Sequence, residues 1–214
     1  MNQDNELDKE LIVNARKPEG ELGSKMIDRV NKSHESLAQW GVSHLNIQNN
    51  DIILDIGCGG GVNVKRFNEM AQDGKVYGLD YSELSVEESI KHNKVSIDEG
   101  KVEILQGSVS ELPFDNETFD FVTAFETVYF WPDFVNDLKE VNRVLKHDGA
   151  IFICNEAVGE KEVLDKLEKH IDLLNMNVYS EDELAKGLSE AGFVNITLFR
   201  KKGTDLVCAV ARKE

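Results

Sequence analysis

Apolar and polar positions follow two periods along this chain, and together they predict alternating strands and helices. Short apolar runs predict buried strands at 52–56, 75–79, 102–105, 119–125 and 150–154. Apolar residues at three- and four-residue steps predict helices between them at 62–70, about 82–97 and 133–145. Buried strands that alternate with helices are typical of a parallel sheet covered on both faces. The pattern therefore predicts a doubly wound α/β fold.

The two ends of the chain depart from this alternation. Residues 1 to about 20 are polar and lack periodicity, which predicts a flexible arm, and an amphipathic helix is predicted from Ser24 to about Leu45. Near the other end, helices are predicted along 164–174 and from the capping box at Ser180 to Gly192. Two strands follow at 194–199 and 206–210, and their short connection requires an antiparallel hairpin.

Length and charge limit the class of protein. The 214 residues suit one α/β domain, which we place at 48–214, after an arm and helix at 1–47. The formal charge of −16 disfavours nucleic-acid binding, because phosphate backbones attract positively charged surfaces. The sequence shows neither an apolar run that could span a bilayer nor a signal-peptide core, so we expect a cytoplasmic protein that does not bind membranes. The oligomeric state stays open.

Cysteines and histidines give no sign of a metal site. The three cysteines lie far apart without a CxxC pair, and Cys154 and Cys208 are interpreted as buried small apolar residues. The five histidines show neither an HExxH pattern nor the spacing of Cys/His ligands. We therefore expect no metal.

A glycine-rich turn follows the first predicted strand. Glycines at 57, 59 and 61 let the backbone turn tightly and approach a ligand closely. The dinucleotide fingerprint needs a further glycine where this chain has Val62, and the carboxylate of Asp55 would repel a pyrophosphate. A cationic ligand fits better. S-adenosylmethionine carries an ammonium and a sulfonium and no phosphate.

A second carboxylate, Asp80, ends the second predicted strand about twenty residues beyond the glycines. At this position a charged acceptor can bind both hydroxyls of a ribose. The alternative is that Asp80 only caps the helix that begins near Ser82.

These motifs resemble those of class I S-adenosylmethionine-dependent methyltransferases, most closely the small-molecule branch often labelled methyltransferase type 11. The resemblance covers about residues 50–155 and is carried by the segments 53–61, 78–82, 112–114, 119–120 and 143–146. It implies a mostly parallel seven-stranded sheet of order 3-2-1-4-5-7-6, in which strand 7 is antiparallel. It also implies that the N-terminal helix covers the cofactor as a lid.

The resemblance assigns cofactor-binding residues by position. The methionine part of S-adenosylmethionine would lie against Asp55, Gly57 and Gly59, and the ribose on Asp80. The adenine would lie between Tyr81 and Val109.

One position departs from the family pattern. Ser108 stands where the family commonly has an acidic residue that binds the adenine amino group. Either the Ser108 hydroxyl accepts this hydrogen bond as a weaker partner, or the backbone at Val109 makes the contact.

Methyl transfer from a sulfonium is an in-line displacement that releases a neutral thioether, so catalysis needs positioning and not an acid. A base helps only where the acceptor carries a proton. Glu126 and Tyr129, in the loop after the fourth predicted strand, are our catalytic candidates. Alternatively, Phe130 and Trp131 only pack this loop and Glu126 only caps it.

Other residues have weaker claims to the site. Glu156 follows the fifth strand in a similar position, and residues 157–180 could form a second lid. His34 and Trp40 on the N-terminal helix are interpreted first as structural residues, although this helix would be one wall of the site. The acceptor is predicted to be an unidentified small molecule.

Two other functions stay open. An NAD-dependent oxidoreductase shares the strand–glycine–helix–carboxylate arrangement, but Val62 and Asp55 disfavour it. A non-catalytic S-adenosylmethionine-binding protein would have the same pocket, because no single residue is indispensable for methyl transfer.

Overall fold

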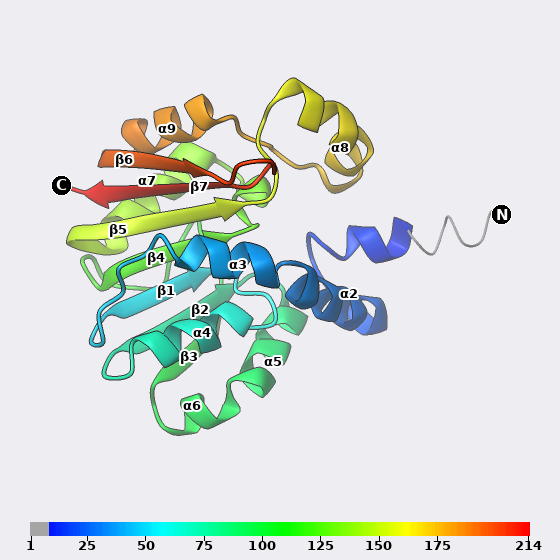
Figure 1. Cartoon of the computed structure of the whole chain (residues 1–214). Helices are drawn as coiled ribbons and strands as arrows, with labels where there is room; N and C mark the ends of the chain where they lie inside the picture. The colour runs from blue at the N-terminus through cyan, green and yellow to red at the C-terminus, as the bar shows by residue number, and fades with distance from the viewer. Residues whose placement is uncertain (1–8) are drawn as a thin grey trace.

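Residues 9–214 are described in the computed structural model, and a single seven-stranded sheet organises them (Figure 1). Its order is β3-β2-β1-β4-β5-β7-β6. The strands β1 to β5 run parallel, and β7 is antiparallel to both β5 and β6. The bounds are β1 Ile52–Ile56, β2 Lys75–Asp80, β3 Val102–Gln106, β4 Phe119–Phe125, β5 Leu145–Asn155, β6 Phe193–Arg200 and β7 Val207–Lys213. The predicted doubly wound sheet, its order and the closing hairpin are confirmed.

Helices cover both faces of the sheet, and each face has its own apolar core. On one face, Leu37 of α3 and Phe67 of α4 pack with Phe152 of β5. On the other face, Leu138 of α7 and Leu188 of α9 pack with Ile151. The helices are α2 Gly20–Ser33, α3 Glu35–Val42, α4 Val62–Met70, α5 Glu83–His92, α6 Lys94–Asp98, α7 Phe134–Val144, α8 Lys161–Leu174 and α9 Glu181–Glu190, with a 3-10 turn η1 at Val128–Phe130.

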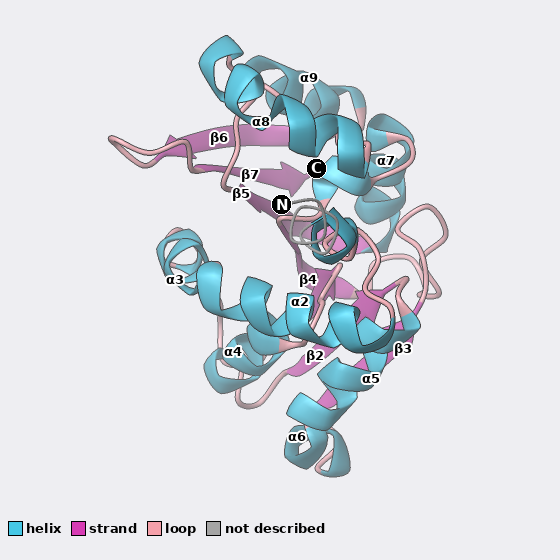
Figure 2. Ribbon diagram, turned by 90° about the vertical axis from the view of Figure 1, so that its right-hand side faces the viewer, coloured by secondary structure: helices cyan, strands magenta, loops and turns pink. Residues whose placement is uncertain are grey.

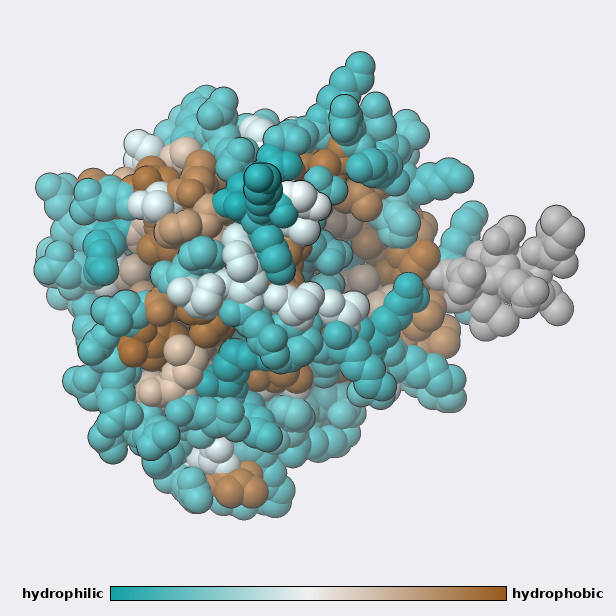
Figure 3. Space-filling view, viewed as in Figure 1, coloured by the Kyte–Doolittle hydropathy of each residue, from teal (hydrophilic) through white to brown (hydrophobic). Residues whose placement is uncertain are grey.

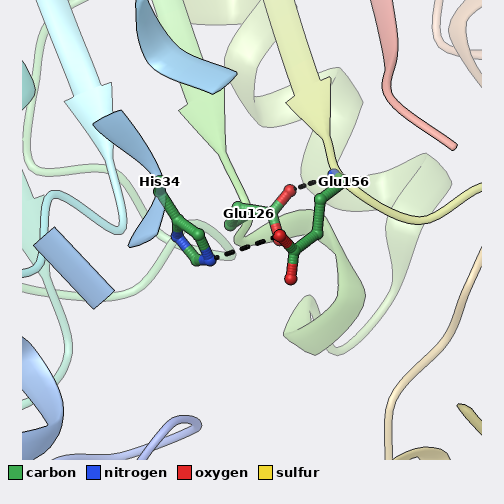
Figure 4. A group of neighbouring side chains, drawn as sticks. All are labelled: His34, Glu126 and Glu156. Carbon is green, nitrogen blue, oxygen red and sulfur yellow. Dashed lines mark hydrogen bonds and ion pairs between the residues drawn. The ribbon is translucent and has the colours of Figure 1, made fainter. Parts of the chain in front are cut away.

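Two predicted helices are each divided in the structure. The helix predicted at 82–97 is interrupted at Asn93, whose buried side chain donates hydrogen bonds to the carbonyls of Gly61 and Ser89, both at 3.0 Å. Side-chain amides that bond backbone carbonyls compete with helix geometry in this way. The predicted N-terminal helix is divided at His34, which ends α2 and precedes α3. This division turns His34 toward the carboxyl end of the sheet (Figure 4).

The fifth strand is longer than the predicted 150–154. Leu145 pairs with Phe119 before a bulge, and the regular pairing resumes between Ala150 and Phe121. The intervening polar residues hid this extension from the hydrophobic pattern.

Residues 9–19 differ from the predicted flexible arm. Residues 9–13 are helical, and hydrogen bonds attach the residues that follow to α8 on one side and to the region after β2 on the other. The Arg16 guanidinium donates to the Leu174 carbonyl at 3.1 Å, while the Tyr81 hydroxyl donates to the Arg16 carbonyl. Ser82 donates to the Pro18 carbonyl at 2.8 Å. Residues 1–8 of the predicted arm lie outside the described residues, and the division of the chain at residue 47 stays a prediction.

The N-terminal segment lies between α2 and α8 at one end of the sheet (Figure 2). Hydrophilic residues cover most of the face seen in Figure 3, with smaller apolar areas between them. Within residues 9–214, no helix combines the length and apolar character that crossing a membrane requires.

Candidate active site

A cavity of about 500 Å³ opens at the carboxyl ends of the central strands. This volume lies within the range of small-molecule and cofactor sites. Turns after β1, β2, β4 and β5 form its floor, and the N-terminal segment, α2, the start of α3 and the end of α8 form its walls. Seven of the nine residues assigned to cofactor binding or catalysis from the sequence line it, namely Asp55, Gly57, Gly59, Asp80, Tyr81, Glu126 and Tyr129.

The glycine turn after β1 adopts backbone conformations that favour glycine. Gly57, Gly59 and Gly61 have φ angles of +70°, +52° and +77°. A Cβ at Gly57 would lie 2.3 Å from the Thr127 Oγ1 atom, and one at Gly61 would lie 2.3 Å from the Ser89 Oγ atom. A Cβ at Gly59 would meet no atom within 4 Å, although Gly59 lines the cavity. The backbone at Gly59 is thus the part of the turn that a ligand can approach most freely.

Asp80 ties this turn to the end of β2. One carboxylate oxygen accepts a hydrogen bond from the Gly59 amide and the other accepts one from the Ser82 amide, both at 2.9 Å. The N-cap of α5 is Ser82, whose hydroxyl accepts a hydrogen bond from the Ser85 amide. Asp80 therefore supports the helix start from two positions before the cap, and it also lines the cavity. Its burial raises the pKa of the carboxyl group.

Asp55 is a buried acid with a single polar side-chain partner among residues 9–214. It is 2% exposed, and the Thr123 hydroxyl donates to its carboxylate at 2.7 Å. Burial raises the pKa of Asp55 to about 7. No lysine, arginine or histidine of residues 9–214 forms an ion pair with it. A cationic ligand would supply the missing positive charge.

The three residues expected around the adenine are not brought together in the cavity. Tyr81 lines it and is partly exposed. Ser108 is exposed and its hydroxyl accepts a hydrogen bond from the Ser110 amide at 3.2 Å, whereas Val109 is buried in the apolar core. Neither of these two lines the cavity. Their contacts with adenine stay predictions.

Glu126 and Tyr129 lie at the other end of the cavity. Glu126 has a φ angle of +58°, a backbone conformation that non-glycine residues rarely adopt. Its Oε1 atom accepts a hydrogen bond from the Glu156 amide, and the Tyr129 hydroxyl lies 3.5 Å from the same atom. That hydroxyl accepts a hydrogen bond from the Ala157 amide at 3.0 Å. Burial and the nearby Glu156 raise the pKa of Glu126 to about 8.

The structure adds two residues to this end that sequence reasoning ranked below Glu126. His34 and Glu156 converge with Glu126 from three separate segments, as Figure 4 shows. The His34 Nε2 atom lies 3.7 Å from a carboxylate oxygen of Glu156. In the sequence, the only signals for these two residues were a histidine on the apolar stripe of a predicted helix and a glutamate directly after a predicted strand. Of the two aromatic candidates in the η1 region, Phe130 lines the cavity, while Trp131 is buried in the core.

A sheet of this order, with a glycine turn after β1 and a carboxylate after β2, defines the fold of class I methyltransferases, and three comparisons agree. The family described as "Methyltransferase domain" matches residues 54–153. The putative methyltransferase YrhH of Bacillus subtilis (strain 168) is 31% identical over 139 residues, covering 64% of this chain and 76% of that protein. A demethylmenaquinone methyltransferase of Staphylococcus aureus (strain JH9) is 28% identical over 202 residues, covering 81% of this chain and 82% of that protein.

A solved structure shares the fold. It is the complex between the Haloferax volcanii Trm112 methyltransferase activator and the putative methyltransferase, with a TM-score of 0.76 and 19% identity over 89% of this chain and 94% of the matched chain. Several other demethylmenaquinone methyltransferases match over only about half of their own length. This chain belongs to the class I S-adenosylmethionine-dependent methyltransferases, in the branch described by that methyltransferase domain.

The residues of the cavity fit S-adenosylmethionine. The backbone at Gly59 is open to a ligand, and the carboxylates of Asp55 and Asp80 are buried beside it. Two buried acids with raised pKa values suit a ligand that carries two positive charges. A pyrophosphate would meet the same carboxylates with like charge, which argues against the NAD-dependent alternative.

Proposed function

We propose that this protein transfers a methyl group to a small-molecule acceptor, and that one end of the cavity binds the cofactor while the other end binds the acceptor. Asp55, Gly57 and Gly59 would hold the methionine part of S-adenosylmethionine, and Asp80 would bind the ribose. Glu126 and Tyr129 would face the acceptor. The observation that carries the proposal is one continuous cavity that joins the Asp55–Asp80 end to the Glu126–Tyr129 end.

S-adenosylmethionine supplies an activated methyl group on its sulfonium. The protein then has to hold the acceptor in line with that methyl group and keep water out. The N-terminal segment, which hydrogen bonds hold in place, and α8 form walls of the cavity, which supports their role as lids. Phe130 adds an aromatic surface on which an acceptor can pack.

Glu126 enters this scheme mainly as a protonated acid near pH 7, because its pKa is about 8. In this form it can donate a hydrogen bond to the acceptor through one carboxyl oxygen. The Glu156 amide and the Tyr129 hydroxyl fix the other oxygen and thereby the direction of the group. Above pH 8 the same carboxylate could take a proton from the acceptor.

Calorimetry with S-adenosylmethionine, S-adenosylhomocysteine and NAD tests the cofactor end. We expect binding of the first two and no response to NAD. Asp80→Asn should weaken binding about tenfold or more, because it removes a charged acceptor from the ribose hydroxyls. Glu83→Gln, an exposed change on the following helix, is the matched control. Binding of NAD alone would overturn the proposal.

Turnover tests the acceptor end and separates an enzyme from a non-catalytic binding protein. The assay measures S-adenosylhomocysteine formation with a panel of hydroquinones, phenols and amines. Hydroquinones belong in the panel because the relative from Staphylococcus aureus is named for demethylmenaquinone. Turnover that drops in Glu126→Gln and in Tyr129→Phe, while S-adenosylhomocysteine still binds, supports the assigned roles. Unchanged turnover in both variants would contradict them.

A further inference from the structure

The side chains of His34, Glu126 and Glu156 form a cluster, but the imidazole makes no direct hydrogen bond with either carboxyl group. One ligand atom from each residue lies within 4.8 Å of the other two. His34 comes from the junction of α2 and α3, Glu126 from the end of β4 and Glu156 from the end of β5 (Figure 4). No direct hydrogen bond joins the imidazole to either carboxylate, because the shortest separation, to Glu156, is 3.7 Å. The three groups therefore face one another across a gap.

The gap is slightly wider than the space around a coordinated metal ion. Metal bonds to imidazole nitrogen and carboxylate oxygen measure about 2.0–2.2 Å, which places neighbouring ligand atoms about 3.0–3.6 Å apart. The His34–Glu156 separation of 3.7 Å is within a few tenths of an ångström of this range. The other separations, which lie within 4.8 Å, would have to close by about 1 Å around a bound ion. Glu126 is already oriented for this purpose, since its Oε1 atom is held by the Glu156 amide and its Oε2 atom has no hydrogen-bond partner in residues 9–214.

The carboxyl groups of the cluster also lack a lysine or arginine partner. Across residues 9–214, no lysine or arginine pairs with Glu126 or Glu156, and the latter has His34 as its one ion-pair partner. Paired carboxylates with an imidazole are ligands that divalent transition metals accept. The three side chains sit on the wall of the cavity, so coordination positions on the cavity side are free for another ligand.

We propose that His34, Glu126 and Glu156 bind one divalent transition metal ion, such as Zn²⁺ or Mn²⁺, with open coordination positions that face the cavity. The role of the ion rests on the proposed function above, and a bound ion would replace the proton that Glu126 carries in that scheme. An acceptor hydroxyl at an open position loses its proton to solvent more readily. Its oxygen then forms the new C–O bond while the C–S bond of the sulfonium breaks and a neutral thioether leaves. The site thus favours acceptors whose methylated atom is a hydroxyl oxygen.

Metal titration of the full chain tests the site directly. After treatment with a chelator and dialysis, Mn²⁺ is added alone and the free ion is followed by electron paramagnetic resonance. We expect one tight equivalent per chain. Pulsed measurements on the Mn²⁺-loaded wild-type protein should detect the nitrogen of one imidazole, a readout that requires no variant to fold.

Variants then assign the ligands. His34→Ala, Glu126→Gln and Glu156→Gln should each weaken Mn²⁺ binding more than about tenfold, because loss of even outer partners changes metal affinity about 10- to 100-fold. His170→Ala is the matched control, since His170 lines the same cavity outside the cluster. It should bind Mn²⁺ as the wild type does. Calorimetry with S-adenosylhomocysteine confirms that each variant is folded.

Three outcomes would overturn the metal site. They are the absence of a one-to-one Mn²⁺ or Zn²⁺ complex, equal affinity in all variants, and an imidazole signal that survives His34→Ala. Binding of methylammonium without metal binding, lost in Glu126→Gln, would show that the cluster recognises an organic cation instead. Methyl transfer that persists in metal-free protein would refute the catalytic role of the ion and leave the proposed function intact. Failure of the protein to bind S-adenosylmethionine would count against the proposed function alone.

Discussion

Alanine substitutions at Gly57 and Gly59 should have very different effects on stability, although both glycines belong to one turn. Both have positive φ angles, +70° and +52°, and this conformation costs an alanine about 1–2 kcal/mol. At Gly57 the new Cβ would also lie 2.3 Å from the Oγ1 atom and 2.7 Å from the Cβ atom of Thr127. Overpacking of this kind costs a further ~1–3 kcal/mol. At Gly59 no atom lies within 4 Å of the new Cβ.

We therefore expect Gly57→Ala to lower the free energy of unfolding by about 2–5 kcal/mol and Gly59→Ala by about 1–2 kcal/mol. Urea titrations at constant m-value measure both. The double variant Gly57→Ala/Thr127→Ala should recover part of the loss, because it removes the nearest Thr127 atom. Gly59→Ala should weaken S-adenosylhomocysteine binding more than Gly57→Ala does, although its effect on folding is the milder of the two. Equal stability losses in the two single variants would refute this account of the turn.

Three further predictions concern other parts of the molecule. Burial raises the pKa of Asp55 to about 7, so its stabilising contribution is fully present below about pH 4 and is lost as the pH rises through 7. Relative to the ligand-free wild type, the free energy of unfolding of Asp55→Asn should therefore rise by on the order of 4 kcal/mol between pH 4 and pH 8, as measured by urea unfolding. A difference between the two proteins that does not change with pH would count against this prediction. Tyr81→Phe removes the hydrogen bond to the Arg16 carbonyl, so trypsin should cleave after Arg16 several times faster than in the wild type; unchanged cleavage would show that this bond does not hold the segment. Cys154 and Cys208 are fully buried with the pKa of Cys154 raised, so both should resist iodoacetamide until the protein unfolds, and rapid native labelling would contradict the structure.

The fold could be predicted to a large extent because its signals are local. Buried strand segments such as 150–154 form uninterrupted apolar runs, and the short link around 201–204 permits only a hairpin. The strand order itself came from the resemblance to a family and not from periodicity. The errors lie where a single polar side chain acts on the backbone. Asn93 ends α5 through bonds to two carbonyls, and nothing in the helical pattern around it indicates these partners.

The site residues that could be predicted from the sequence lie next to the ends of predicted strands. Asp55 and Asp80 follow from their positions at the ends of two strands, and both line the cavity. The cluster around Glu126 could not be found in the same way. Its three members lie far apart in sequence, and His34 reaches it only because the N-terminal helix is divided at that residue. Long-range convergence of this kind is set by the packing of whole elements and leaves no spacing in the sequence.

The electrostatics of the cofactor end connect stability with recognition. Asp55 and Asp80 are buried with raised pKa values, so ligand-free protein bears the cost of holding two acids away from water. In the proposed placement, the ammonium and sulfonium of S-adenosylmethionine lie near Asp55 and favour its ionised form. Methyl transfer removes the sulfonium charge, and the product loses part of that attraction. The affinity of the donor relative to the product should therefore rise as the pH passes 7, because the ionised Asp55 distinguishes a sulfonium from a thioether and the protonated acid does not.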